Sequence, residues 1–335
     1  MRKEERQMRK KNGSVLHLAK KITEDLNKRE TGLSKPQLIG LADIAGSVLA
    51  AKSVNTSEIA SLLPRTCKNV EDRYRYINRW LSNEKINPDQ VMAGYYKQLF
   101  KTALSQKTAV VFMIDQSTIG RGFECLMLSA RLGNRAVPLA WQVRKTQGNI
   151  GFEVQKDLLK SIVTSLPSNL NIVLMGDRFY GTGKMIELCE SFGWHYRFRL
   201  KGNLHLYDHT GALITPQKAH QLGLKELEKV RLGENGPTIQ VGIIQEAGHP
   251  EPWFIAMDQK PTQGHTLDYG KRWGIEALFS DLKSRGFGIT QTQLQHPERI
   301  ERLILVLTIA YYWAVSTGME PQNDRLKSKK KSSDL

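Results

Sequence analysis

Two short apolar runs, residues 109–114 (AVVFMI) and 171–175 (NIVLM), constrain the fold of this chain more than any other feature of its sequence. A strand covered on one face alternates apolar and polar residues, whereas a strand covered on both faces is apolar almost throughout. The two runs therefore predict two central strands of a sheet. Asp115 directly follows the first run, and Asp177 follows the second after one glycine.

The segments around these runs predict an α/β core. Three strands come first, and a helix, a strand, a helix and a strand then follow along the chain. We expect the further elements at residues 124–130, 136–143, 152–166, 184–192 and 195–201, with a Gly133-Asn134 turn joining the second and third strands.

The charge of the chain narrows the class of its partner. It has 49 Lys and Arg residues against 33 Asp and Glu residues, a formal net charge of +16, and the excess is densest in the first third. This favours a polyanionic partner, because each Lys or Arg placed on a phosphate releases condensed counterions. A basic protein whose charges are merely solvated is the alternative.

Targeting and redox features are few. The three separated cysteines predict reduced cytosolic thiols. The basic N-terminus has no apolar segment behind it, so no secretory signal is expected. The apolar run 303–315 falls short of the roughly 20 residues that a membrane span needs, which predicts a buried helix and no membrane partner.

Changes of pattern along the chain predict its organisation. Helical spacing of apolar residues dominates before residue 105, where a DNA-binding bundle and an ordinary helical cap are the two interpretations. We expect a flexible basic leader at 1–14, a helical DNA-binding domain at 15–104, an α/β core at 105–201 and 261–318, a β insertion at 202–260 and a basic tail at 319–335.

A third carboxylate is expected on a helix at 269–283. At about 100° per residue, its Tyr, Arg, Glu and Lys side chains fall within about 60° of one another, apart from the apolar stripe of the same helix. A surface helix with a simple Arg–Glu pair is the alternative, but it does not explain why four functional groups share one row. The row consists of Tyr269, Arg272, Glu276 and Lys283.

Three carboxylates that converge on one point suit a pair of divalent cations. Ligands bind at the carboxyl ends of strands in open α/β sheets, where Asp115 and Asp177 are expected, although a single Asp there is usually a turn or cap residue. Together with Glu276 they would hold two Mg²⁺ or Mn²⁺ ions, which favour oxygen ligands and in-line phosphoryl displacement. Arg272 and Lys283 would then hold substrate phosphates.

Two further basic sets are candidates for DNA contact. Arg197, Arg199 and Lys201 alternate onto one face of the strand expected at 195–201, although a solvated edge strand explains the same pattern. The helix expected at 71–81 carries three arginines away from its apolar stripe, namely Arg73, Arg75 and Arg79.

The spacing Tyr269-x2-Arg272-x3-Glu276-x6-Lys283 resembles the YREK signature of the insertion-sequence-four family of DDE transposases. Asp115 in FMIDQST and Asp177 in VLMGDRFY resemble the first two acids of that family, and the resemblance covers about residues 65–315. It implies an RNase H-like mixed sheet with flanking helices, interrupted by a β-strand insertion and preceded by a small all-helical N-terminal domain.

The resemblance also implies an activity and its partners. A relative of this family nicks transposon ends with divalent metal ions and joins the freed 3′-hydroxyl to target DNA, in cut-and-paste members through a hairpin. It implies double-stranded DNA with terminal inverted repeats, a dimer, and a prokaryotic cytoplasm where the protein is associated with the nucleoid. Trp253 in PWFIAM resembles the Trp on which a flipped base stacks, and the segment 69–83 resembles the helix that binds end sequences.

Two other functions remain open at this point. One is an RNase H-like nuclease that cleaves DNA without strand transfer. The other is a DNA-binding regulator that keeps the fold but has no catalytic activity. For Trp253, a buried strand residue is the alternative to a base-stacking role.

Overall fold

A computed structural model describes residues 2–167, 169–246 and 248–319. The chain divides into two compact units, one formed by Met92–Phe279 and the other by Met1–Val91 together with Ser280–Leu335. The basic tail expected at 319–335 lies, beyond residue 319, outside the described residues.

The unit Met92–Phe279 is built on a mixed sheet. Strands β1, β2 and β3 form an antiparallel meander, β4 pairs parallel to β1, and β5 pairs parallel to β4. The strand order β3-β2-β1-β4-β5 is that of an RNase H-like core, so the predicted fold class is confirmed. The bounds are β1 (Val110–Thr118), β2 (Phe123–Leu132), β3 (Arg135–Lys145), β4 (Ile172–Gly176) and β5 (His195–Arg199).

The predicted β insertion extends this sheet. Strand β10 pairs antiparallel to β5, and β9, β8, β6 and β7 follow in order, so the described residues form a single sheet of ten strands. The bounds are β6 (Leu206–Tyr207), β7 (Leu213–Ile214), β8 (Glu226–Leu232), β9 (Thr238–Ile244) and β10 (Trp253–Met257), with the short helix α8 (Pro216–Gln221) between β7 and β8.

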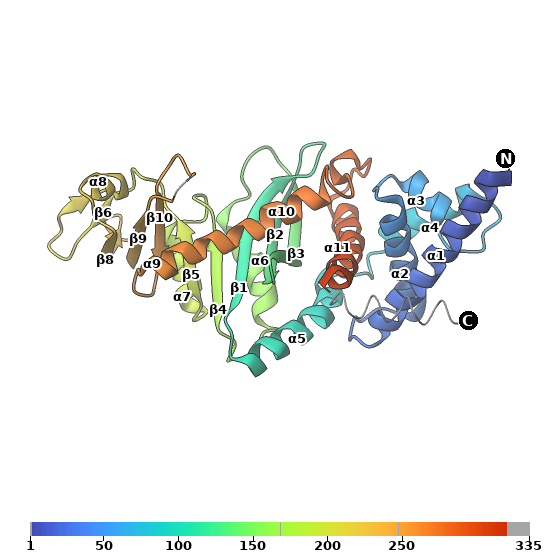
Figure 1. The fold of residues 1–335 in the computed structure, drawn as a ribbon, viewed down its shortest axis with the longest axis horizontal. Coiled ribbons are helices and arrows are strands. Elements are labelled where there is room, and N and C mark those ends of the chain that lie inside the picture. Colours follow the sequence, from blue (N-terminus) through green and yellow to red (C-terminus); the bar gives the residue numbers. More distant parts are fainter. Residues whose placement is uncertain (1, 168, 247, 320–335) are drawn as a thin grey trace. The chain divides into compact units, whose positions relative to one another are not determined.

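Helices cover the sheet. Because successive side chains of a strand point to opposite faces, Phe112 and Met113 of β1 face different layers. The ring of Phe112 lies 5.9 Å from that of Phe100 and 5.6 Å from that of Trp194, whereas the sulfur of Met113 lies beside Gly274. Figure 1 shows the segment from α9 to α10 running across the strands. These helices are α5 (Pro88–Gln106), α6 (Phe152–Val163), α7 (Gly183–Ser191), α9 (Gln263–Leu267), the 3-10 helix η1 (Asp268–Arg272) and α10 (Trp273–Leu282).

The other unit is helical. Its helices are α1 (Arg2–Asn27), α2 (Lys35–Ala51), α3 (Thr56–Leu62), α4 (Val70–Leu81), the 3-10 helix η2 (Ile289–Gln291) and α11 (Pro297–Met319). Two expectations differ from this arrangement. Residues 2–14, expected as a flexible leader, belong to α1, because their many Lys, Arg, Glu and Gln residues are good helix formers. Helix α11, assigned from the sequence to the α/β core, packs against α2 and α4 in the helical unit.

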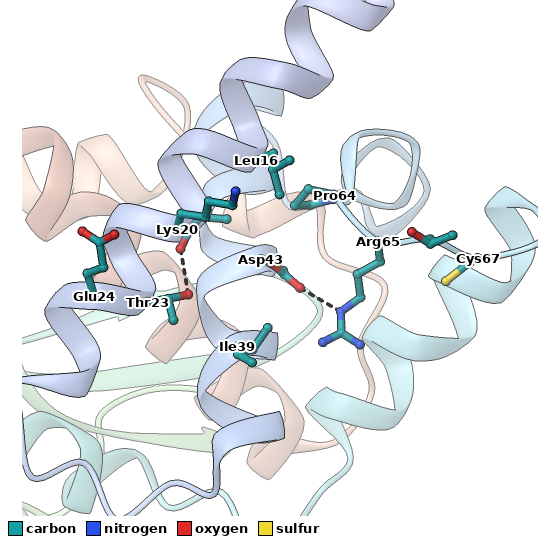
Figure 2. A pocket seen from close by; sticks show the side chains of 11 residues that line it. Leu16, Lys20, Thr23, Glu24, Ile39, Asp43, Pro64, Arg65 and Cys67 are labelled. Atoms are coloured by element: carbon teal, nitrogen blue, oxygen red, sulfur yellow. Dashed lines mark hydrogen bonds and ion pairs between the residues drawn. The ribbon is translucent and has the colours of Figure 1, made fainter.

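Long-range hydrogen bonds join the elements of the helical unit. The indole of Trp80 donates a hydrogen bond to the carbonyl of Gln37 at 3.0 Å. Arg302 of α11 is buried and donates to the carbonyls of Ile86 and Leu81 at 3.2 and 3.1 Å. Arg65 donates a hydrogen bond to the buried Asp43 at 2.7 Å, and both residues line a pocket of about 550 Å³ (Figure 2).

Within the described part of the chain, a bilayer could not be crossed by any helix on its own; α2 and α3 meet the criteria of length and apolar character only as a pair, bent by 105°.

Replacing Arg302 by Met should lower the free energy of unfolding by about 3 kcal/mol or more. Each hydrogen bond from a charged donor contributes roughly 1.5–3 kcal/mol, and the change leaves two carbonyls without their donor. Urea unfolding followed by tryptophan fluorescence measures the change. The control is Arg75→Met, which removes an exposed pair with Glu71 that is worth about 0.5 kcal/mol or less. Equal effects of the two variants would contradict the role assigned to Arg302.

Candidate functional site

Two acidic residues lie side by side at the edge of the sheet formed by the carboxyl ends of the parallel strands β1 and β4. In the parallel pairing of β1 with β4, Met113 is the partner of Met175, so that Asp115 and Asp177 both come two residues further along. Asp177 directly follows β4, whereas β1 continues through Asp115 to Thr118 while its burial decreases. The sequence prediction that these two carboxylates meet at neighbouring strands agrees with this register.

Arg272 connects the third acid to the first. Its guanidinium lies 3.3 Å from a carboxylate oxygen of Asp115 and also donates a hydrogen bond to Glu276, which lies in the first turn of α10. The side chain of Arg272 is only 10% exposed, and that of Glu276 is 53% exposed. One buried cation therefore bridges a largely buried carboxylate and a solvent-facing one.

The environment of Asp115 disfavours its charged form. Burial raises the pKa of its carboxyl to about 6, and the negative charges of Asp177 and Glu276 add to the effect. The cation of Arg272 and the backbone N–H of Gln116, which donates at 2.8 Å, act in the opposite direction without cancelling the rise in pKa. The carboxylate of Asp177 accepts a hydrogen bond from the backbone N–H of Phe179 at 2.8 Å.

The donor set suits a hard divalent cation. Asp115, Asp177 and Glu276 offer carboxylate oxygens, which Mg²⁺ prefers. Burial raises the pKa of Asp115, and a bound cation would stabilise the charged form that this burial disfavours. The three are not assembled as a cage: within residues 2–319, apart from residues 168 and 247, no three His, Cys, Asp or Glu side chains are grouped closely enough to hold a metal ion. Arg272 lies between two of the carboxylates instead.

The row of four side chains expected on one helix is divided between different elements. Tyr269 and Arg272 lie in the 3-10 helix η1, Glu276 lies in α10, and Lys283 follows the last residue of α10. A 3-10 helix turns by about 120° per residue, so the 100° spacing used in the sequence analysis does not hold before residue 273. Tyr269 is buried rather than presented in an open row, and burial raises its pKa to about 12.

Trp253 lies in a cluster of aromatic rings. It is 2% exposed and makes edge contacts with Tyr269 and Trp273 at 5.5 and 5.3 Å. A base could stack on its indole only after these neighbours had moved. The exposed ring of the cluster is Trp273, which is 40% exposed and stacks on His249 at 5.0 Å. Trp273 was not among the residues predicted from the sequence, although it directly follows Arg272 of the signature.

The basic strand does not present its cations as expected. Strand β5 lies between β4 and β10, so it is not an edge strand. Arg197 is 2% exposed, donates hydrogen bonds to the carbonyl of Tyr196 and to Gln259, and lies 3.6 Å from Asp258. Its register with Met175 and Met113 puts it on the covered face of the sheet, where Met113 lies beside Gly274. Arg197 is therefore an internal ion-pair residue and not an exposed phosphate contact. Arg199 pairs with Glu251 at 3.3 Å, and Lys201 is exposed beyond the strand.

The arginines predicted on α4 have different surroundings. Arg73 donates to the carbonyl of Ser61 at 3.5 Å, and Arg75 pairs with Glu71 at 3.3 Å. Arg75 and Arg79 line an open groove of about 740 Å³. The groove also contains Arg299 of α11, which the sequence analysis missed because it is distant in the chain; its other lining residues are Asp72, Tyr74, Asn78 and Ser82.

Comparisons with known proteins add three findings. Residues 141–313 match the family described as Transposase DDE domain. No curated protein matches the chain. A solved structure of Ciona intestinalis Endonuclease V, in complex with a 24mer DNA containing an inosine followed by a ribo-adenosine, is similar over 56% of this chain and 97% of that chain, with 10% identity and a TM-score of 0.30.

The raised pKa of Asp115 predicts a pH dependence of stability. The pKa of Asp115 in the folded protein is about 6, above the ordinary value of 3.8. Its contribution to the free energy of unfolding is therefore fully present below about pH 4 and is lost as the pH rises through 6. Asparagine cannot ionise, so Asp115→Asn does not lose this contribution. At about 1.4 kcal/mol per pKa unit, the free energy of unfolding of Asp115→Asn relative to the wild type should increase by about 3 kcal/mol from acid to neutral pH. Urea unfolding in EDTA at several pH values measures this.

The exposed Asp157 of α6 provides the control, because Asp157→Asn also removes one carboxylate. A stability difference between Asp115→Asn and the wild type that does not change with pH would contradict the assignment.

Proposed function

The chain belongs to the family of transposase DDE domains, and on that premise we propose that it is a cut-and-paste transposase of the insertion-sequence-four type whose catalytic acids are Asp115, Asp177 and Glu276. Family membership makes it a DNA-cleaving transposase. The observation that carries the choice of residues is the register of β1 and β4, which places two acids at one sheet edge, with the third tied to Asp115 through Arg272.

The matched segment supports this choice. Residues 141–313 include Asp177 and Glu276 and every residue of the YREK spacing, whereas Asp115 lies before the matched segment. Asp115 is selected by position, because its strand is the parallel neighbour of the strand that precedes Asp177. The raised pKa of Asp115 is the kind of perturbation that clusters at functional sites.

Asp115, Asp177 and Glu276 are the residues that would hold divalent cations, Mg²⁺ or Mn²⁺, two in number. When bound, such ions stabilise the attacking and leaving oxygens of an in-line phosphoryl displacement. The role of the chain is to orient the scissile phosphate and to balance charge. In the free protein Arg272 pairs with Asp115 and Glu276 and offsets one of their two negative charges. Its planar guanidinium could donate to a phosphate once the carboxylates held cations.

The remaining parts of the proposal concern DNA. Lys283 completes the YREK spacing and is assigned to phosphate contact, and Tyr269 supports the guanidinium of Arg272, which lies 5.7 Å from its ring centre. The groove with Arg75, Arg79 and Arg299 is assigned to the double-stranded inverted repeats, because clustered arginines contact the DNA backbone. A dimer acting in a prokaryotic cytoplasm completes the proposal.

Glu276→Gln should abolish cleavage. The change keeps the size of the side chain but removes its charge, and the rate should fall to below about one hundredth of the wild-type rate, as when one group that stabilises transition-state charge is lost. The measurement is a gel assay with Mg²⁺ on DNA that contains the inverted repeats flanking the gene. The exposed Glu187 on α7 supplies the matched control, Glu187→Gln.

Each outcome of this assay has a clear meaning. Cleavage that survives Glu276→Gln overturns the assignment of the third acid. Cleavage by the wild type without joined products supports a nuclease that lacks strand transfer. Binding without cleavage by any variant supports a DNA-binding regulator.

The aromatic cluster predicts different defects for two tryptophans. Trp273→Ala should reduce hairpin formation by about tenfold more than the first nick, because stacking of a base on an exposed ring is worth roughly 1–3 kcal/mol. Trp253→Ala should instead lower the free energy of unfolding by about 3–5 kcal/mol, since the ring is buried. Denaturing gels and urea unfolding measure the two effects. A stable Trp253→Ala protein with a selective hairpin defect would return the stacking role to Trp253.

A further inference from the structure

Two arginines at the carboxyl ends of neighbouring strands share one carboxylate. Arg178 directly follows Asp177 after β4, and Arg199 is the last residue of β5, the parallel neighbour of β4. Glu251 comes from the segment that precedes β10, which pairs with the other side of β5. The three residues meet at the edge of the sheet that carries the candidate acids.

The contact is made by a single oxygen atom. Oε2 of Glu251 accepts hydrogen bonds from the guanidinium groups of both Arg178 and Arg199, the latter at 3.3 Å. The same guanidinium nitrogen of Arg199 also donates a hydrogen bond to the carbonyl oxygen of Pro252 at 3.5 Å. Two cations therefore converge on one anionic oxygen, which is how paired arginines hold an oxygen of a phosphate.

The charges in this group are not balanced. Two guanidinium groups face one carboxylate, and Nε of Arg199 is buried without a hydrogen-bond partner among the described residues. The side chains of Arg178 and Glu251 are 43% and 58% exposed, so the pair lies open to solvent. Exposed ion pairs contribute little to stability, and a stronger anion can therefore displace the carboxylate.

The excess positive charge of Arg178 and Arg199 lies next to the candidate catalytic residue Asp177. Arg178 is adjacent in sequence to a candidate catalytic acid. Burial lowers the pKa of the Arg199 guanidinium, and the nearby positive charges of Arg178 and Arg272 lower it further. A DNA strand whose phosphate approaches Asp177 would bring neighbouring phosphates along the same edge of the sheet. A structural salt bridge would not require two cations at this point.

We propose that Arg178 and Arg199 form a binding site for a backbone phosphate of DNA beside Asp177, and that Glu251 occupies this site until a phosphate displaces it. The inference rests on the proposed function, because it assumes that DNA reaches this edge of the sheet. Glu251 thereby lowers the affinity for DNA in general and favours DNA that is held by other contacts as well.

The test compares binding of a fluorescein-labelled DNA duplex by fluorescence anisotropy, in EDTA so that no strand is cut. Glu251→Gln should bind at least about threefold more tightly than the wild type, because it frees two cations for phosphates. Arg178→Gln should bind more weakly and reduce the slope of log K against log salt by about 0.9, the value for one lost phosphate contact. Arg178→Lys keeps the charge and should restore most of the affinity.

A double-variant experiment separates this site from a general effect of charge. In a protein that carries both Arg178→Gln and Arg199→Gln, the further change Glu251→Gln should give no gain in affinity. Glu228→Gln is the matched control, because Glu228 is 51% exposed and its partner is Lys260 at 4.0 Å. If Arg199→Gln lowers the thermal stability, the comparison is made with Arg178→Gln alone.

Three results would overturn the proposal. Equal affinities of Glu251→Gln and Glu228→Gln would show that Glu251 does not compete with DNA. Weaker binding by Glu251→Gln would show that Glu251 only holds the arginines in place. Both results leave the proposed function intact if the wild type still cleaves DNA, whereas a folded wild type that neither binds nor cleaves DNA overturns both.

Discussion

The parallel pairing of β1 with β4 is the constraint on which the rest of the structure depends. Both strands are mainly apolar and buried, so burial of their side chains sets their register, and a slip by one residue would turn every side chain of one strand to the other face. Asp115 and Asp177 follow this register to one edge of the sheet. The same burial that stabilises β1 raises the pKa of Asp115, so the packing of the core and the chemistry of its edge have one cause.

Ionic groups at this edge have oppositely charged partners within the chain, although the charges do not cancel. Arg272 lies between Asp115 and Glu276, and Glu251 lies between two arginines. A buried charge without a partner is costly, so a site that binds both cations and phosphates needs internal counterions when neither is present. The two arrangements differ in burial. Arg272 is nearly covered, whereas Glu251 is mostly exposed, which makes the second pair the easier one to exchange.

Sequence patterns predicted the parts of the fold that depend on local periodicity. Apolar runs identified β1 and β4 and their central position, and changes of pattern gave the order of the elements along the chain. The patterns failed where tertiary packing decides: Arg197 fits an exposed face by alternation, but it shares a covered face of the sheet with Met113 and Met175 and is buried. They also failed at η1, because the predicted row of side chains assumed α-helical spacing, whereas residues 268–272 form a 3-10 helix. The partnership of Arg199 with Glu251 joins residues far apart in the chain, and no local signal predicts it.

The net charge of the chain and the charge it can offer to DNA are different quantities. Arg197, Arg272 and Arg302 are all buried, and each is held by carbonyl or carboxylate oxygens of its own unit. These cations hold the fold together and contribute to the formal charge of +16 without facing solvent. Counterion release counts only the cations that reach phosphates. The composition therefore overstates the positive charge that a DNA partner could reach. Under the proposed function, the arginines available to phosphates are exposed ones such as Arg75 and Arg178, each of which pairs with an exposed carboxylate.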